Sequence, residues 1–429
     1  MRTLRKRLQQ AAIVFTLALC VAAGVAFAEY LRRGGDTAAL ADAILRTAQG
    51  EGMPRASSEG AHWEIDWSGA LDAVHSARGW LLKRVPAQAD EEDGLELPGI
   101  IEPGLDEPGI IEPDLDAAVR VYFGPVEPGM ANGMKRALLD LIGSADETLF
   151  VAAFTLGHEG IAEALIARHE AGVRVGVVSD SDYRDDAAMQ QVLAAGIPVV
   201  FDERSAYMHN KFVIVDGHTV WTGSANLTDN GFFFNRNNAI TVRSRGLAEN
   251  YTAEFKEMYR DGLFGPRSPP GVPNPVLHVG SVKVRTLFAP EDDVIAAITD
   301  EMHGARNHIE FMAYAFSCEH IAGAMASGLE RGVAVRGLFE RVHAARDWSR
   351  DDYLAARGAE VFVCASPGKM HHKVIVVDRE LVMTGSYNFS RSAAESNDEN
   401  VVLLRCAEIA ARYVEELDRL VLDAEEGPF

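Results

Sequence analysis

Two stretches of the chain carry the same pattern of polar residues. They read His209-Asn-Lys-Phe-Val-Ile-Val-Asp-Gly-His-Thr-Val-Trp-Thr-Gly-Ser-Ala-Asn226 and His371-His-Lys-Val-Ile-Val-Val-Asp-Arg-Glu-Leu-Val-Met-Thr-Gly-Ser-Tyr-Asn388. On an extended strand, a histidine and a lysine two residues apart point to the same face, so both can meet one phosphate. Each lysine is followed by a run that is apolar on both faces, which is typical of a strand buried at the centre of a sheet. The pattern therefore predicts two strand-turn-strand units with matching polar faces.

The match belongs to a longer internal repeat. Residues 149–154 match 309–314 and residues 172–178 match 332–338 at an offset of 160, while 195–200 match 357–362 at an offset of 162. A repeat of this kind indicates duplication. Apolar β-branched runs alternate with stretches of helical spacing such as 161–169, so we expect a strand, helix, strand order and mostly parallel sheets. The sequence thus predicts two similar α/β halves, 118–265 and 276–423, joined by the proline-rich stretch 266–275.

The recurring positions of the two units are His209, Lys211, Asp216, Gly223, Ser224 and Asn226, and then His371, Lys373, Asp378, Gly385, Ser386 and Asn388. This duplicated His-x-Lys-x4-Asp-x6-Gly-Ser-x-Asn pattern resembles the signature of the phospholipase D superfamily, and the resemblance covers residues 118–423. That superfamily includes lipid phosphodiesterases, headgroup transferases, cardiolipin-cleaving enzymes and nucleases. The resemblance implies a phosphoric diester hydrolase in which two α/β halves pack around one active site.

The resemblance also implies a division of labour that needs no metal and no cofactor. One histidine forms a covalent phosphohistidine, and the other donates a proton to the leaving group and then activates water or an alcohol. The family usually assigns the nucleophile to the first motif, which points to His209, with His371 as the acid. The residues expected to hold the nonbridging phosphate oxygens are Lys211, Lys373, Asn226 and Asn388, with Ser224 and Ser386 supporting them.

The two copies differ eleven residues past the asparagine of the motif, where the second has Glu399 and the first has Asn237. A carboxylate bonded to an imidazole raises its basicity and fixes its tautomer, and the sequence leaves open which histidine Glu399 serves. Asp216 and Asp378 follow the lysines at an odd spacing and so point to the opposite face. We expect them to be structural and to bond turn amides or an arginine in the other half.

A metal site is not favoured by this pattern. His371 and His372 are adjacent and would face opposite sides of a strand, and the two lysines would repel a cation. The sequence therefore predicts a reaction driven by side chains alone.

The N-terminal part of the chain is typical of an exported protein. Arg2, Arg5, Lys6 and Arg7 precede an uncharged run that ends at Ala28, so residues 1–28 are predicted to be a signal peptide, with an uncleaved membrane anchor as the alternative. We assign no role to residues 29–89. A tandem acidic Pro/Gly repeat makes 90–117 an extended linker. The sparse cysteines do not describe a disulfide framework.

The substrate class is left with two candidates. The net charge of −22 argues against a surface that coats nucleic acid, although eleven of the acids lie between residues 90 and 116. We expect a phospholipid at a membrane surface, for which an exposed Phe232–Phe234 run would form an apolar rim. The alternative is an exported nuclease, and a non-enzymatic binding module is a third class. A nuclease would need a groove lined by Arg174, Arg204, Arg236, Arg341 and Arg346.

Overall fold

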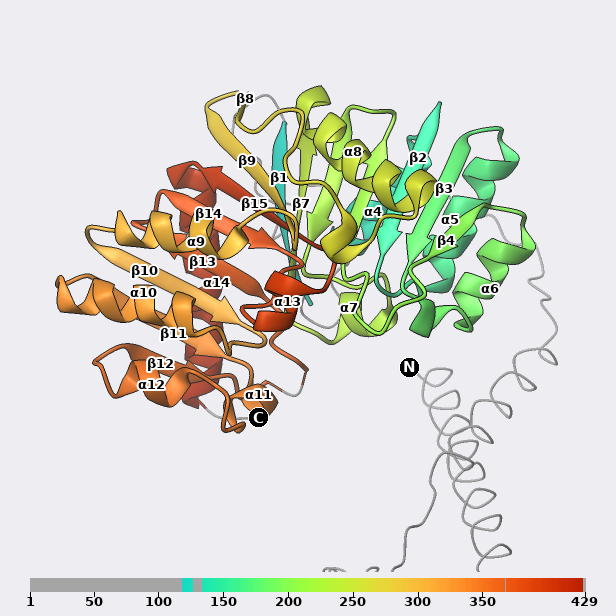
Figure 1. Cartoon of the computed structure of the whole chain (residues 1–429). Coiled ribbons are helices and arrows are strands. Elements are labelled where there is room, and N and C mark those ends of the chain that lie inside the picture. The colour runs from blue at the N-terminus through green and yellow to red at the C-terminus, as the bar shows by residue number, and fades with distance from the viewer. Residues whose placement is uncertain (1–117, 126–132, 367, 427–429) are drawn as a thin grey trace, which may run out of the picture. The chain divides into compact units, whose positions relative to one another are not determined.

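The computed structural model describes residues 118–125, 133–366 and 368–426. The predicted signal peptide, the region 29–89 and the acidic linker 90–117 lie outside the described residues. Within the described part, two sheets stand side by side and helices cover them (Figure 1). In this part of the chain, no helix has both the length and the apolar character needed to cross a membrane.

The first sheet has seven strands. In spatial order they are β1 (Val119–Gly124), β7 (Asn237–Arg243), β6 (Thr219–Gly223), β5 (Lys211–Val215), β2 (Thr148–Ala153), β3 (Arg174–Ser179) and β4 (Val199–Phe201). The first motif forms β5 and β6, and β5 is the central strand. All five of its residues are buried, as the apolar run after Lys211 predicts.

The second sheet has eight strands. Their order is β12 (Glu360–Val363), β11 (Ala334–Phe339), β10 (His308–Ala313), β13 (Lys373–Val377), β14 (Leu381–Gly385), β15 (Glu399–Arg405), β9 (Val282–Ala289) and β8 (Leu277–Val279). The second motif forms β13 and β14, and β13 is fully buried. The prediction of two similar α/β halves is therefore confirmed. The limits predicted at residues 265 and 276 fall between the last helix of the first half and β8.

The expectation of mostly parallel sheets was wrong. Only β2, β3 and β4 are parallel in the first sheet, and only β10, β11 and β12 in the second. All the other neighbours are antiparallel, including the pairs β2·β5 and β5·β6. The motif itself is a hairpin with three residues between β5 and β6, and so short a connection can join only antiparallel strands.

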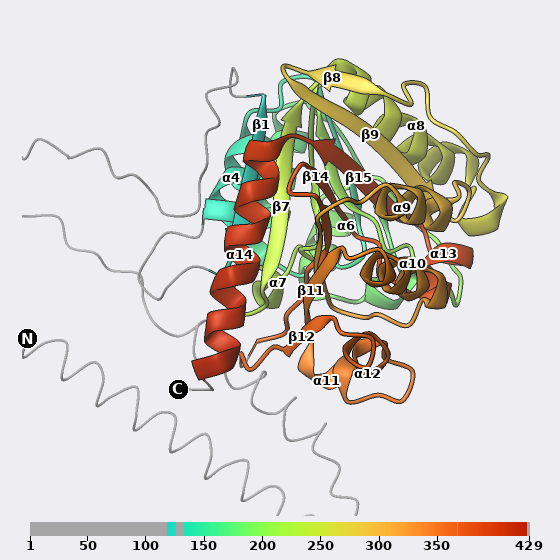
Figure 2. The same cartoon turned by 90° about the vertical axis from the view of Figure 1, so that its left-hand side faces the viewer.

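Helices cover the outer faces of both sheets. The first sheet carries α4 (Gly133–Gly143), α5 (Glu159–Glu170) and α6 (Ala187–Ala194), and the second carries α9 (Val294–His303), α10 (Glu319–Glu330) and α12 (Asp351–Ala355). Shorter helical segments are α7 (Asp229–Phe233), α11 (Arg341–Ala344), α13 (Arg391–Glu395) and the 3-10 turns Ser181–Tyr183 and Gly265–Arg267. Two longer helices, α8 (Arg245–Asp261) and α14 (Ala407–Glu426), pack on the inner faces; α14 is the red helix of Figure 2.

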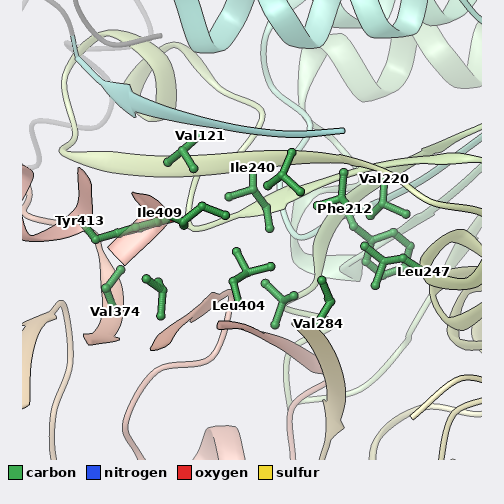
Figure 3. Close-up of a cluster of buried hydrophobic side chains, with 14 of the residues drawn as sticks. Val121, Phe212, Val220, Ile240, Leu247, Val284, Val374, Leu404, Ile409 and Tyr413 are labelled. Atoms are coloured by element: carbon green, nitrogen blue, oxygen red, sulfur yellow. The ribbon is translucent and has the colours of Figure 1, made fainter. Parts of the chain in front are cut away.

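The inner faces of the two sheets share one hydrophobic core. Alternating residues of β5 divide between two clusters, since Phe212 and Ile214 point into the shared core whereas Val213 packs under the outer helices. Figure 3 shows Phe212 from the first sheet in one cluster with Leu404 from the second and with Tyr413 of α14. Because one core joins both halves, the ends of β5 and β13 are held in a defined relation to each other.

The glycine of each motif is required by the backbone. Gly223 has φ +155° and Gly385 has φ +149°. A Cβ atom on Gly223 would lie 2.3 Å from the carbonyl oxygen of Asn238, and one on Gly385 would lie 2.2 Å from that of Asn400. Only glycine allows this close approach, which brings the following serine up to β7 or β15.

Candidate active site

The histidine and lysine of each motif lie at the start of a central strand. Lys211 begins β5 opposite Ala153, the last residue of β2, so the pair lies at the carboxyl end of the parallel strands. The ammonium group of Lys211 donates to the carbonyl oxygen of His209 at 2.7 Å, and Lys373 donates to that of His371 at 2.9 Å. All four side chains are at least nine-tenths buried.

The two halves are joined directly at these histidines. The backbone N–H of His209 donates to the carbonyl of Asp398 at 2.9 Å, and that of His371 donates to the carbonyl of Arg236 at 2.8 Å. Each half therefore pairs the segment before its histidine with the segment before the last strand of the other half. The two contacts are equivalent, because His209 and His371 are 162 residues apart and so are Arg236 and Asp398. The halves are therefore arranged about an approximate twofold axis.

Glu399 serves the histidine of the other half. Its Oε2 lies 2.7 Å from Nδ1 of His209, and it also accepts a hydrogen bond from the Ser386 hydroxyl at 2.6 Å. Burial alone would raise the pKa of Glu399, but His209, Lys211 and Ser386 hold that pKa below its ordinary value. The carboxylate is thus ionised, Nδ1 of His209 donates to it, and Nε2 of His209 keeps its lone pair.

His371 has an amide in the corresponding place. Its Nδ1 lies 2.9 Å from Oδ1 of Asn237, which also accepts from the Ser224 hydroxyl at 2.8 Å. The amide nitrogen of Asn237 donates to the carbonyl of Gly231 at 2.9 Å, so its oxygen must face the imidazole. Both histidines therefore present Nε2 away from these partners, but only His209 has a charged one.

The residues between the histidines and lysines point away from the site. Asn210 donates to Glu254 at 3.2 Å and accepts from Asn400 at 2.8 Å. His372 contacts Asn238 at 2.9 Å through Nδ1. The alternation of side chains that the sequence predicts is therefore observed in both motifs.

The remaining motif residues differ in what they contact. Asn226 and Asn388 are half-buried, and the buried Oδ1 of each has no hydrogen-bond partner within residues 118–125, 133–366 and 368–426. Asp216 accepts from the backbone N–H groups of residues 146–148, and Asp378 from those of 306–308. The two aspartates therefore bond turn amides of their own half, whereas the side-chain oxygens of the asparagines make no hydrogen bond within the described ranges.

Burial lowers the basicity of all four groups of the site, and neighbouring positive charges lower it further at His209, His371 and Lys373. Burial lowers the pKa of His209 to about 4 and that of Lys211 to about 7. The pKa values of His371 and Lys373 lie well below their ordinary values, first because of burial and then because of the neighbouring positive charges. An anion that binds among these groups would relieve the repulsion and raise all four values.

Several contacts of the site were not predicted from the sequence. The Arg204 guanidinium pairs with the buried carboxylate of Asp398, next to Glu399. The hydroxyl of Thr222 donates to Asn400 at 2.8 Å, and that of Thr384 donates to Asn238 at 2.7 Å, both across the two halves. The threonines recur before the glycine of each motif, and this recurrence was the available signal.

The arginines and the phenylalanine run were expected to distinguish a nucleic-acid substrate from a lipid, and the structure shows where some of them lie. Arg174 lies opposite Thr148, at the far end of β2 from Lys211, so it does not line the site. Phe232 is fully buried, whereas Phe233 and Phe234 are 41% and 59% exposed. The groove that the nuclease alternative would need is therefore not completed by Arg174, and the Phe232–Phe234 run is divided between core and surface.

Two predicted absences concern metals and disulfides. Within the described ranges, no group of three or more histidine, cysteine or acidic side chains has the arrangement of a metal site. Cys318, Cys364 and Cys406 are buried free thiols.

The comparisons with known proteins agree with this geometry. The family model of the PLD-like domain of cardiolipin synthase matches residues 138–259 and 298–421, together more than half of the chain. Phospholipase D of Rickettsia bellii is 35% identical over 133 residues, which are 31% of this chain and 66% of that protein. Mitochondrial cardiolipin hydrolase of Xenopus laevis is 34% identical over 136 residues, 31% of this chain and 64% of that protein.

The match thus spans just under two thirds of each of these relatives. Among solved structures, phosphatidylserine synthase of Haemophilus influenzae Rd KW20 has a TM-score of 0.55 and 14% identity, over 71% of this chain and 86% of that chain, which is a likeness of fold. With a PLD-like domain matched in each half, the chain belongs to the phospholipase D superfamily.

Proposed function

We propose that this chain is a metal-independent phosphodiesterase that works through a covalent phosphohistidine on His209. One observation carries the assignment: His209 alone of the two histidines hydrogen-bonds a carboxylate, Glu399, at 2.7 Å. That carboxylate stabilises the positive charge that develops on the imidazole as Nε2 attacks phosphorus. His371, bonded to the neutral Asn237, is the weaker base and the better proton donor.

In the first step, Nε2 of His209 forms a bond to phosphorus and the bond from phosphorus to the leaving oxygen breaks. The proton on Nε2 of His371 passes to that oxygen, so the leaving group departs as an alcohol. In the second step, water gives a proton to His371 and its oxygen attacks phosphorus, while the phosphorus–nitrogen bond to His209 breaks. If an alcohol attacks in place of water, the phosphoryl group is transferred to that alcohol.

The lysines and asparagines supply the electrostatic part. Lys211 and Lys373 lie on the two sides of the approximate twofold, so a phosphate between the histidines would meet an ammonium group from each half. The half-buried amides of Asn226 and Asn388 would complete the contacts to the nonbridging oxygens.

A phospholipid is the substrate class that we propose. Exposed aromatic side chains flank the site: Tyr207 is 45% exposed two residues before His209, and Phe234 is 59% exposed with its backbone against Gly368, close to His371. Large exposed aromatic groups beside a site are suited to a lipid surface. The names of the Rickettsia and Xenopus relatives support the same class. We propose that the protein acts as an exported enzyme at a membrane surface.

The test is hydrolysis by the purified chain in the presence of a chelator, with phosphatidylcholine vesicles, anionic phospholipid vesicles and single-stranded DNA as substrates. We expect release of headgroup from lipid and an acid-quenched covalent phosphoryl adduct that His209→Ala lacks. Cleavage of DNA without lipid hydrolysis would assign the nuclease alternative, and dependence of turnover on added metal would refute the mechanism.

A further inference from the structure

An aromatic ring packs on each histidine of the site, and the two rings are counterparts in the repeat. The centroid of Phe154 lies 4.7 Å from that of His209, and the centroid of Tyr314 lies 4.4 Å from that of His371. The ammonium groups of the two motif lysines lie over the same rings, at 4.9 and 4.7 Å from their centroids. Each half therefore contributes the same arrangement to the phosphate position, a histidine and a lysine packed on one aromatic ring.

The next neighbours of these rings differ in chemistry. Phe154 contacts Tyr183 at 4.8 Å and Tyr207 at 5.2 Å between centroids. Two acidic residues lie near Tyr183, since Asp180 and Asp182 raise its pKa, after the larger effect of its burial. Among the described residues, the rings packed on Phe154 outside the motif are thus those of two tyrosines.

The second-half side has basic residues in the equivalent places. His343 replaces Tyr183 and lies 4.4 Å from Tyr314, while Lys369 replaces Tyr207 with its ammonium group 5.8 Å from the Tyr314 ring. Trp348, which is 41% exposed, lies 5.4 Å from His343. The duplication has therefore kept the positions of these side chains and replaced two tyrosines by a histidine and a lysine.

These basic groups are not neutralised by the fold. Within the described ranges, the exposed Lys369 has no carboxylate at ion-pair distance, and Nδ1 of His343 is buried without a hydrogen-bond partner. The one acid that approaches His343, Glu340, accepts a hydrogen bond from the His343 backbone at 2.9 Å. Burial lowers the pKa of His343 and, next to the opposing effect of Glu340, Lys373 and Lys369 lower it further. The buried histidine nitrogen and the exposed ammonium group both pack on Tyr314, and a bound anion would give each of them a hydrogen-bond partner.

The position of this site relative to the chemistry decides what it binds. His209 attacks phosphorus on the side opposite the leaving oxygen, and that oxygen takes its proton from His371. The leaving alcohol therefore extends toward the residues around His371 rather than those around His209.

We propose that Tyr314, His343 and Lys369 form a leaving-group subsite that selects an alcohol with its own negative charge, of the class that carries a phosphate group. This inference rests on the proposed function. The phosphate group of the alcohol accepts hydrogen bonds from Lys369 and His343, and Trp348 covers its carbon chain. A neutral alcohol leaves both groups unpaired.

The test uses two short-chain soluble phospholipids that have the same acyl chains and differ only in the headgroup, phosphatidylglycerophosphate and phosphatidylglycerol. A charge-assisted hydrogen bond contributes about 1.5–3 kcal/mol, so we expect wild type to show kcat/KM on the order of 10–100-fold higher for the phosphate-bearing headgroup. Lys369→Gln should lower kcat/KM for that substrate by roughly tenfold and leave phosphatidylglycerol within about twofold. His343→Tyr, which installs the first-half residue, should act in the same direction.

Arg174→Gln is the matched control, because Arg174 is an exposed cation at the opposite end of the sheet and its loss should not change the ratio. A second measurement needs no variant: glycerol 3-phosphate should inhibit wild type at concentrations on the order of tenfold or more below those of glycerol. Equal rates on the two lipids, or equal losses in Lys369→Gln, overturn the subsite while leaving the phosphodiesterase intact. A wild type inert toward both lipids and toward DNA overturns the proposed function and the subsite together.

Discussion

Glu399 of the second half lies 2.7 Å from Nδ1 of His209 in the first half, whereas its counterpart Asn237 of the first half lies 2.9 Å from His371 in the second. The exchange of partners across the approximate twofold means that neither half has a complete site alone. One substitution between the copies has made two equivalent histidines unequal. In the proposed mechanism, this difference between a carboxylate and an amide distinguishes the nucleophile from the acid.

Glu399→Gln should lower kcat on the order of 10²-fold or more, because the amide cannot stabilise the imidazolium of His209 and also disturbs its tautomer. The pKa of His209 should fall further, since Glu399 is the neighbour that raises it. Kinetics and NMR titration of the imidazole check both effects. Asn237→Asp is the matched variant: it should raise the pKa of His371. Unchanged turnover in Glu399→Gln would remove the basis for assigning the nucleophile.

The two histidine variants should differ in their response to the leaving group. His209→Ala should lose turnover and the covalent adduct, because the carboxylate-paired nucleophile is gone. His371→Ala should recover part of its rate with a nitrophenyl diester, since general acid catalysis is worth roughly 10²–10⁴-fold and is least needed for a weakly basic leaving group. Acid-quench trapping with both substrates measures this. If His209→Ala still forms the adduct and His371→Ala does not, the two roles are reversed.

The pH dependence of kcat/KM should be displaced to the acid side. This ratio reports protonation in the free enzyme, where His209 must be neutral and His371 protonated. Burial brings the pKa of His209 to about 4 and that of His371 well below 6.5, so the optimum is expected below pH 6.5. Above pH 7 the rate should fall further as Lys211, with a pKa of about 7, loses its charge. A soluble diester measured from about pH 4 to about pH 9 tests this, and an optimum above about pH 8 would contradict it.

Lys211→Met should stabilise the folded protein and lower its activity by roughly 10²–10³-fold. Lys373→Ala should lower the activity by a similar factor. Burial lowers the pKa of Lys211 from 10.5 to about 7, so between these values the unfolded chain holds more protons than the folded one. The free energy of unfolding of wild type therefore rises with pH across this window.

Lys211→Met should therefore raise the free energy of unfolding by about 1–3 kcal/mol relative to wild type at about pH 6. The difference should be smaller at about pH 9, where Lys211 of the folded wild type has lost its proton. Denaturant unfolding at the two pH values measures it. Lys256→Met, at an exposed position of α8, is the control and should change little. A gain that is the same at both pH values would show that the charge of Lys211 is not its source.

Arg204→Met should destabilise the protein by about 3 kcal/mol, because it leaves Asp398 as an uncompensated buried carboxylate. Burial already raises the pKa of Asp398 to about 7 despite Arg204, so the loss should be larger at about pH 8 than at about pH 5, where the carboxyl group takes up a proton. The matched control is Arg184→Met, which breaks the exposed pair with Glu203 and should cost less than about 1 kcal/mol. Thermal unfolding of both variants compares them, and equal losses would contradict the buried role of Asp398.

Much of the fold and of the chemistry could be predicted from the sequence. The buried strands that follow Lys211 and Lys373 were evident from residues apolar on both faces, and the duplication was evident from offsets of 160 and 162. The alternation of side chains along a strand predicted that Asn210 and His372 point away from the site. These features depend on local periodicity, which a linear sequence contains in full.

The partner of Glu399, the antiparallel pairing and the charge difference between the two sides of the site required the tertiary structure. Glu399 and His209 are 190 residues apart, and they meet because β15 of one sheet and the segment before β5 of the other pair across the twofold. Strand direction in the sheets depends on how short the hairpin connections are, not on the periodicity of the strands themselves. Likewise, His343 and Lys369 are ordinary residues in the sequence, and they form one basic site only because Tyr314 holds both of them beside His371. Contacts between distant residues arise from packing of the whole chain, and periodicity within a segment carries no record of them.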